Sequence, residues 1–123
     1  MDKLKYLETN GKKYPMAFTL NVMENVQEAY GSINQWMETL VPSNEEREDK
    51  KTKEPSIKDI KWAFKEFINE GIEIENEETG GNRPLLNLKQ VGRVISEIGI
   101  KEATKTLQNV TIKSVANEDS KNE

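Results

Sequence analysis

The residues whose types and spacing could do chemistry are carboxylates gathered in one short stretch. Five of them fall within residues 70–78: Glu70, Glu73, Glu75, Glu77 and Glu78. Clustered carboxylate oxygens suit hard cations such as Ca²⁺. Their spacing does not match an EF-hand loop, and no fixed ligand geometry follows from it. A solvated acidic loop is therefore the favoured interpretation of this stretch, ahead of a metal site.

The chain contains no histidine and no cysteine. These two side chains supply most general bases near neutral pH, most thiol nucleophiles and most zinc ligands. Lysine, tyrosine and paired carboxylates can also catalyse reactions, but they do so less often. We therefore expect a protein that is not an enzyme and that holds no metal and no cofactor. Its function is to be sought in surfaces that bind other proteins.

Glycines in two places suggest phosphate binding at first sight. Gly80 and Gly81 are adjacent, but no lysine and hydroxyl residue follow them at P-loop spacing, so that interpretation fails. Gly92 lies beside an apolar helical stripe, where close packing of helices accounts for a glycine. Arg93 follows it and is either a surface charge or a partner-binding residue.

Trp62 is a candidate anchor for a protein partner. At about 100° per residue, it points well away from the apolar stripe of its own helix. That stripe consists of Ile57, Ile60, Phe64, Phe67 and Ile68. Tryptophan is enriched in the hot spots of interfaces, although another element, such as the N-terminal hairpin, could instead cover it. Trp36 and Tyr30 are the other candidate partner-binding residues.

Composition narrows the class of protein. The 123 residues carry a net charge of −4, with 34% hydrophobic and 33% charged residues, which fits one domain with a modest core. The negative charge argues against a nucleic-acid partner. No apolar run approaches the roughly 20 residues of a membrane span, and the start MDKLKYLE lacks the apolar core of a signal peptide. A cytoplasmic protein without disulfides and without a membrane partner is expected.

Local signals predict the order of the elements. The dipeptide Asn10-Gly11 predicts the turn of a β-hairpin over residues 3–20, whose lysines protect an exposed edge strand. Helices are expected at about 21–41 and 56–116. Three capping patterns mark helix starts, at Asn21–Glu24, Ser32–Gln35 and Asn87–Gln90. Gly71 is expected to end the helix that begins after Ser56.

Three stretches are predicted to be irregular. Residues 43–55 are almost entirely charged and indicate a flexible linker, residues 75–84 a mobile loop, and residues 117–123 a polar disordered tail. The predicted fold class is α+β and predominantly α. An N-terminal hairpin is followed by about five helices in a single domain spanning residues 1–116.

Three segments resemble the tail assembly chaperones of phages and prophages of Gram-positive bacteria. They are KYLETNGKKYPMAFTLNVMENVQEAYGS near the start, WAFKEFINEGIEIENE in the middle and LKQVGRVISEIG later in the chain. These motifs combine ordinary residues and contain no catalytic signature. The linker and the last residues match nothing in particular, as is usual for loops.

The resemblance implies a small, mainly helical protein that binds the tape measure protein, keeps it soluble and assists assembly of the tail tube. It further implies a cytoplasmic protein that is absent from the mature virion. Many family members also exist as a longer frameshifted form, which would contact the tail tube protein. Self-association is an open alternative, as is a different role as a small prophage-encoded regulatory protein-binding module.

Overall fold

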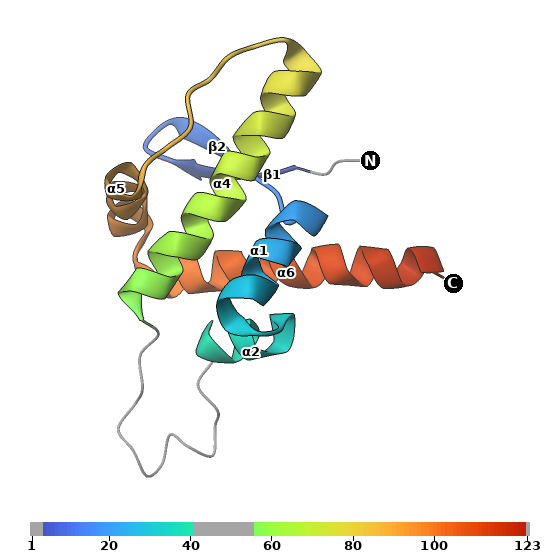
Figure 1. Ribbon diagram of the computed structural model, residues 1–123. Coiled ribbons are helices and arrows are strands. Elements are labelled where there is room, and N and C mark those ends of the chain that lie inside the picture. The colour runs from blue at the N-terminus through green and yellow to red at the C-terminus, as the bar shows by residue number, and fades with distance from the viewer. Residues whose placement is uncertain (1–3, 41–55, 123) are drawn as a thin grey trace.

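The computed structural model describes residues 4–40 and 56–122, and the side chains of these residues as far as 114. In this part of the chain a two-stranded antiparallel sheet is followed by five helices in a compact arrangement (Figure 1). The predicted fold class, α+β and mainly helical with an N-terminal hairpin, is confirmed. The predicted linker at 43–55 lies outside the described residues.

The sheet is a hairpin of two strands, β1 (Lys5–Thr9) and β2 (Lys12–Met16). Asn10 and Gly11 join them with φ angles of 52° and 75°, the positive values that a type I′ turn requires. Tyr6 lies opposite Pro15 in the register. Counting from the two-residue turn, this pair is one of those that exchange no hydrogen bonds. The missing N–H of the proline therefore removes no bond between the strands.

The helix α4 (Ile57–Thr79) is the central element and contacts β2, α1, α5 and α6. It begins at Ser56, whose Oγ accepts a hydrogen bond from the backbone N–H of Asp59 at 3.3 Å. It ends at Gly80, which has a left-handed φ of 77°. The prediction that this helix stops at Gly71 is wrong. It continues through that glycine and takes in the first residues of the predicted loop 75–84.

Gly71 lies where α4 passes close to the hairpin. A Cβ atom at this position would be 2.5 Å from the carbonyl carbon of Pro15 and 2.7 Å from the nitrogen of Met16. One turn earlier on α4, the carbonyl of Phe67 accepts a hydrogen bond from the N–H of Ala17 at 3.1 Å. The absence of a side chain thus allows strand and helix to approach, and it does not end the helix.

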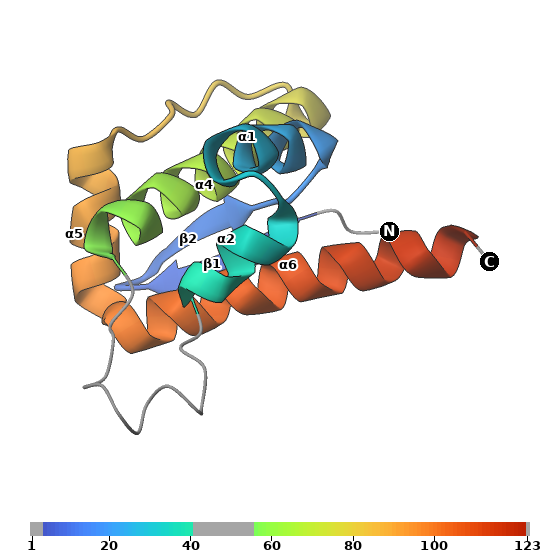
Figure 2. The ribbon, with the colours of Figure 1, turned by 60° about the horizontal axis from the view of Figure 1, so that its bottom comes forward.

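Four more helices complete the described part of the chain: α1 (Leu20–Tyr30), α2 (Ile33–Leu40), α5 (Leu88–Ile98) and α6 (Ile100–Asn122). The predicted capping box at Asn87 and Gln90 is present at the start of α5. The box predicted at Asn21 is not, because α1 begins after Thr19 without a side-chain cap. The helix α6 runs along one side of the molecule (Figure 2) and remains helical to Asn122, where a tail was expected.

The core combines most of the predicted stripes of α4 and α5 with residues from the hairpin exit and the other helices. Ile57 and Leu88, the first residues of the two stripes, are exposed instead, because each lies at the start of its helix. Its centre holds three aromatic rings from distant parts of the chain. The centroid of Phe18 lies 6.4 Å from that of Trp36 and 5.2 Å from that of Phe67, and the latter two are 5.7 Å apart. None of the described helices is long and apolar enough to cross a membrane.

Candidate functional site

Trp36 belongs to the core, so the expectation of a partner contact there is corrected. Its side chain is fully buried and packs between Phe18 and Phe67. The residue lies on the apolar stripe of α2, together with the buried Leu40. A tryptophan on such a stripe faces the interior of a small domain, where it contributes packing area and no binding surface. Its Nε1 has no hydrogen-bond partner among the described residues.

Arg93 lies on the solvent side of α5, where its side chain is exposed. The buried residues of this helix, Val91, Val94 and Ile95, face the core instead. Gly92, next to it, contacts the flexible side chain of Lys61 and no helix backbone. Close helix packing therefore does not require this glycine, and Arg93 lies at the outer surface of α5.

Tyr30 and Trp62 are the two candidate residues that the structure brings together. Tyr30 is the last residue of α1, and its ring meets the ring of Trp62 edge to face, with centroids 5.6 Å apart and an interplanar angle of 66°. Both side chains are partly buried. Such aromatic pairs contribute about 0.5–1.5 kcal/mol beyond the area they bury. The pair forms a corner between the end of α1 and the first half of α4.

The hydroxyl of Tyr30 donates a hydrogen bond to Oδ1 of Asp59 at 2.8 Å. Burial of the phenol, followed by this bond and the negative charge of Asp59, raises the pKa of Tyr30 far above its ordinary value. The phenol therefore keeps its proton throughout the physiological range. This arrangement suits a structural hydrogen bond and does not supply a base or nucleophile near neutral pH.

Hydrogen bonds between α1 and α4 explain why Trp62 is partly buried. Near the start of α1, the hydroxyl of Thr19 donates to Oε2 of Glu70 at 2.6 Å, and Asn25 donates to Oε1 of Glu66 at 2.9 Å. On α4, these glutamates and Trp62 are spaced so that they share one side of the helix. The element that covers Trp62 is thus α1, and the hairpin, which was the expected alternative, packs on another side of α4.

Two asparagines of α4 hold the segment that follows it. Asn69 accepts a hydrogen bond from the N–H of Leu86 at 2.9 Å and donates to its carbonyl at 3.0 Å. Asn76 makes the same two bonds with the backbone of Arg83, at 2.9 and 3.0 Å. We call residues 80–87 the strap. Half of the predicted mobile loop 75–84 is therefore helix, and the strap that follows is fastened to that helix.

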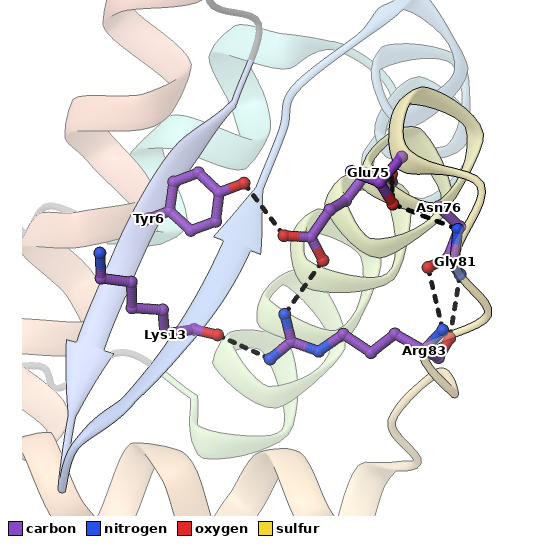
Figure 3. A network of polar contacts seen from close by, with 7 residues as sticks. Tyr6, Lys13, Glu75, Asn76, Gly81 and Arg83 are labelled. Atoms are coloured by element: carbon purple, nitrogen blue, oxygen red, sulfur yellow. Dashed lines mark hydrogen bonds and ion pairs between the residues drawn. The ribbon is translucent and has the colours of Figure 1, made fainter.

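The side chain of Arg83 connects the strap to the hairpin (Figure 3). Its Nη1 forms an ion pair with Oε1 of Glu75 at 3.1 Å, and its Nη2 donates to the carbonyl of Lys13 at 2.6 Å. The hydroxyl of Tyr6 donates to the other oxygen of Glu75 at 3.0 Å. The guanidinium also lies over the ring of Tyr14, 5.7 Å from its centroid. These contacts make the network a structural joint between three segments.

The glutamates in the second half of α4 fall into two groups, one that is hydrogen-bonded to other elements and one that is exposed. Glu70 and Glu75 accept hydrogen bonds from other elements, whereas Glu73, Glu77 and Glu78 are exposed. Within the described ranges, no group of three or more such ligands is placed to hold a metal ion.

Sequence patterns did not single out the roles of Asn69, Asn76 or Arg83. One signal was present, because the two asparagines are seven residues apart and therefore lie on the same side of one helix, two turns apart. That spacing becomes meaningful only when α4 is known to continue past Gly71.

Comparisons of the chain with protein-family models, with curated proteins and with solved structures found no match. The candidate site is therefore defined by its geometry. It is the corner at which the partly buried pair Tyr30 and Trp62 reaches the surface between α1 and α4.

Proposed function

We propose that this protein is a phage tail assembly chaperone that binds the tape measure protein and keeps it soluble while the tail tube assembles. The observation that carries the proposal is the resemblance of three segments, residues 5–32, 62–77 and 88–99, to that family. These segments supply the hairpin with α1, most of α4, and α5, and β2, α1 and α5 all contact α4.

A binding role also agrees with the chemistry of the site. Trp62 is held partly exposed by its edge-to-face contact with Tyr30, which positions a large ring at the surface with little freedom left to lose on binding. A tape measure protein is long and presents apolar helical stripes that aggregate unless covered. Many copies of a small helical protein can cover such a stripe, since bound neighbours on one chain raise the effective concentration. Modest single contacts also permit release when tube subunits arrive.

The test is co-expression with the tape measure protein encoded downstream in the same phage genome. We expect the soluble fraction of the tape measure protein to rise several-fold and the two proteins to co-purify. An unrelated helical protein of similar size and charge, expressed from the same vector, is the control.

If the tape measure protein is equally soluble with and without this chain, the proposal is refuted. A stable complex with a prophage repressor, without any effect on the tape measure protein, would instead favour the regulatory binding module. Immunoblots of purified virions check the associated expectation that the chaperone is absent from the finished particle.

A further inference from the structure

A surface formed by α4 and α5 combines exposed apolar side chains with lysines. We define the α4–α5 face by six residues: Ile57, Lys61, Trp62, Lys65, Leu88 and Lys89. The side chain of Lys61 crosses from α4 to α5, where its Cε and Nζ lie 3.3 and 3.4 Å from the position that a Cβ on Gly92 would take. This contact shows that the two helices contribute to one continuous surface.

Helix periodicity places the other members next to that contact. Ile57 and Lys65 lie one turn before and one turn after Lys61 on α4, and Leu88 lies one turn before Gly92 on α5. Ile57 and Leu88 are large apolar side chains with 59% and 46% of their surface exposed. Trp62, about 100° around α4 from Lys61, adds a partly buried ring at the edge of the face that adjoins α1. The face is therefore apolar at several points along its length.

The charge on this face is positive, although the whole chain carries −4. Among the described residues, the one ion pair is between Glu75 and Arg83, so the lysines of the face have no acidic partner there. The two acidic residues in the first half of α4 both bind α1: Asp59 accepts a hydrogen bond from the hydroxyl of Tyr30, and Glu66 accepts one from the side chain of Asn25. Along α5, no acidic residue precedes Glu97, which accepts a hydrogen bond from Thr9 of the hairpin.

From these observations we infer that the α4–α5 face docks an amphipathic helix of the partner whose apolar stripe is flanked by acidic residues. The apolar stripe would pack on Ile57, Leu88 and Trp62, and its glutamates or aspartates would pair with the flanking lysines. At Gly92 the nearest neighbours are atoms of the flexible end of Lys61, which can move to admit a partner side chain. The exposed apolar side chains of this face and the negative net charge of the whole chain favour such a helix over a nucleic acid, although the face itself carries lysines.

This inference rests on the proposed function for the identity of the partner, since the helix would belong to the tape measure protein. The preference of the α4–α5 face for an acidic amphipathic helix can be tested without the tape measure protein. Two labelled peptides of about 20 residues serve as probes, since shorter helices are marginal in water. Both carry leucines at heptad positions a and d; one has glutamates at the flanking positions and the other has lysines. Binding is measured by fluorescence anisotropy at low and at high salt.

We expect the glutamate peptide to bind at least tenfold more tightly than the lysine peptide at low salt, with the preference reduced at high salt. The double variant Lys61→Glu/Lys65→Glu should abolish or reverse the preference. The control variant Lys101→Glu/Lys105→Glu makes the same charge change at the same spacing on exposed positions of α6, and it should leave the preference unchanged. Thermal melts of both variants confirm that each remains folded.

Three outcomes would overturn the inference. They are no binding of the glutamate peptide, equal binding of the two peptides, and an equal loss of the preference for the glutamate peptide in the α4 variant and in the α6 control variant. Binding of a single-stranded oligonucleotide at this face in preference to the glutamate peptide would also overturn it. Failure of the proposed function is distinguishable, because it would leave the peptide preference intact while the tape measure protein stays insoluble. Conversely, a soluble tape measure protein whose solubility survives Lys61→Glu/Lys65→Glu would refute the docking face alone.

Discussion

Replacing Gly71 with alanine tests the close approach of α4 to the hairpin. Inside an exposed helix this change stabilises a protein by about 1 kcal/mol, because glycine has the poorer helix propensity. At this position the added methyl carbon would lie 2.5 Å from the carbonyl carbon of Pro15 and 2.7 Å from the nitrogen of Met16. Both neighbours are backbone atoms, so neither can move aside by a change of rotamer.

The expected magnitude follows from the displacement that the methyl group demands. Ordinary contact begins at 3.4 Å, so the hairpin must move away by about 0.9 Å at the level of Pro15. Overpacking of this kind costs about 1–3 kcal/mol. The hydrogen bond from Ala17 to Phe67, now 3.1 Å long, would be stretched and would lose about 1 kcal/mol more. The gain in helix propensity offsets the loss of the hydrogen bond, so we expect Gly71→Ala to destabilise the protein by about 1–3 kcal/mol.

Urea denaturation monitored by circular dichroism gives the free energy of unfolding for comparison with Gly92→Ala. This second variant is a matched control, because it also adds one methyl group to a helix but meets only the flexible end of Lys61, at 3.3 Å. We expect it to be neutral or to stabilise by up to about 1 kcal/mol. If Gly71→Ala proves as stable as Gly92→Ala, the close packing of α4 on the hairpin is refuted.

Three further predictions concern other contacts. Tyr30→Phe should lose about 1 kcal/mol at neutral pH with the bond to Asp59. The pKa of Tyr30 is raised in the folded state, so its stabilising contribution is present below its ordinary pKa of 10.0 and declines above it. Above that pH, the free energy of unfolding measured by urea denaturation should therefore fall less steeply with pH for the variant than for the wild type. Asn69→Ala should speed hydrogen exchange of the Leu86 amide, which its side chain now protects; an unchanged rate would count against the fastened strap. Trp36→Ala should destabilise the fold by about 3–5 kcal/mol, as for other buried aromatic residues, and a variant of near-normal stability would contradict its place in the core.

Local features of the fold followed from the sequence because short-range physics decides them. Asn10 and Gly11 tolerate positive φ wherever they occur, and the side chain of Asn87 caps the helix that starts just after it, whereas Asn21 lies inside α1 and caps nothing. The stripes of α4 and α5 identified core residues for a similar reason, since the side that is apolar must be covered. The turn, the cap and the general class of fold were therefore predictable.

Gly71 and Trp62 show what the sequence left open. A glycine inside an apolar pattern is equally compatible with a helix end and with a close neighbour, and only the distance to Pro15 distinguishes the two. Trp62 was correctly placed off the stripe, but which element covers it depends on how α1 packs after residues far apart in the chain have met.

The surface was decided by tertiary structure to an even greater degree. Asn69 looks like any polar helical residue until the strap returns along α4 and pairs with it. Lys61 and Leu88 belong to one face only because α5 packs beside the first half of α4. Composition and periodicity determined most of the buried side chains, since that preference acts on each residue separately, but they did not reveal that Ile57 and Leu88 stay exposed. Which exposed side chains become neighbours is fixed by long-range packing, and this alone assembles a surface able to bind a partner.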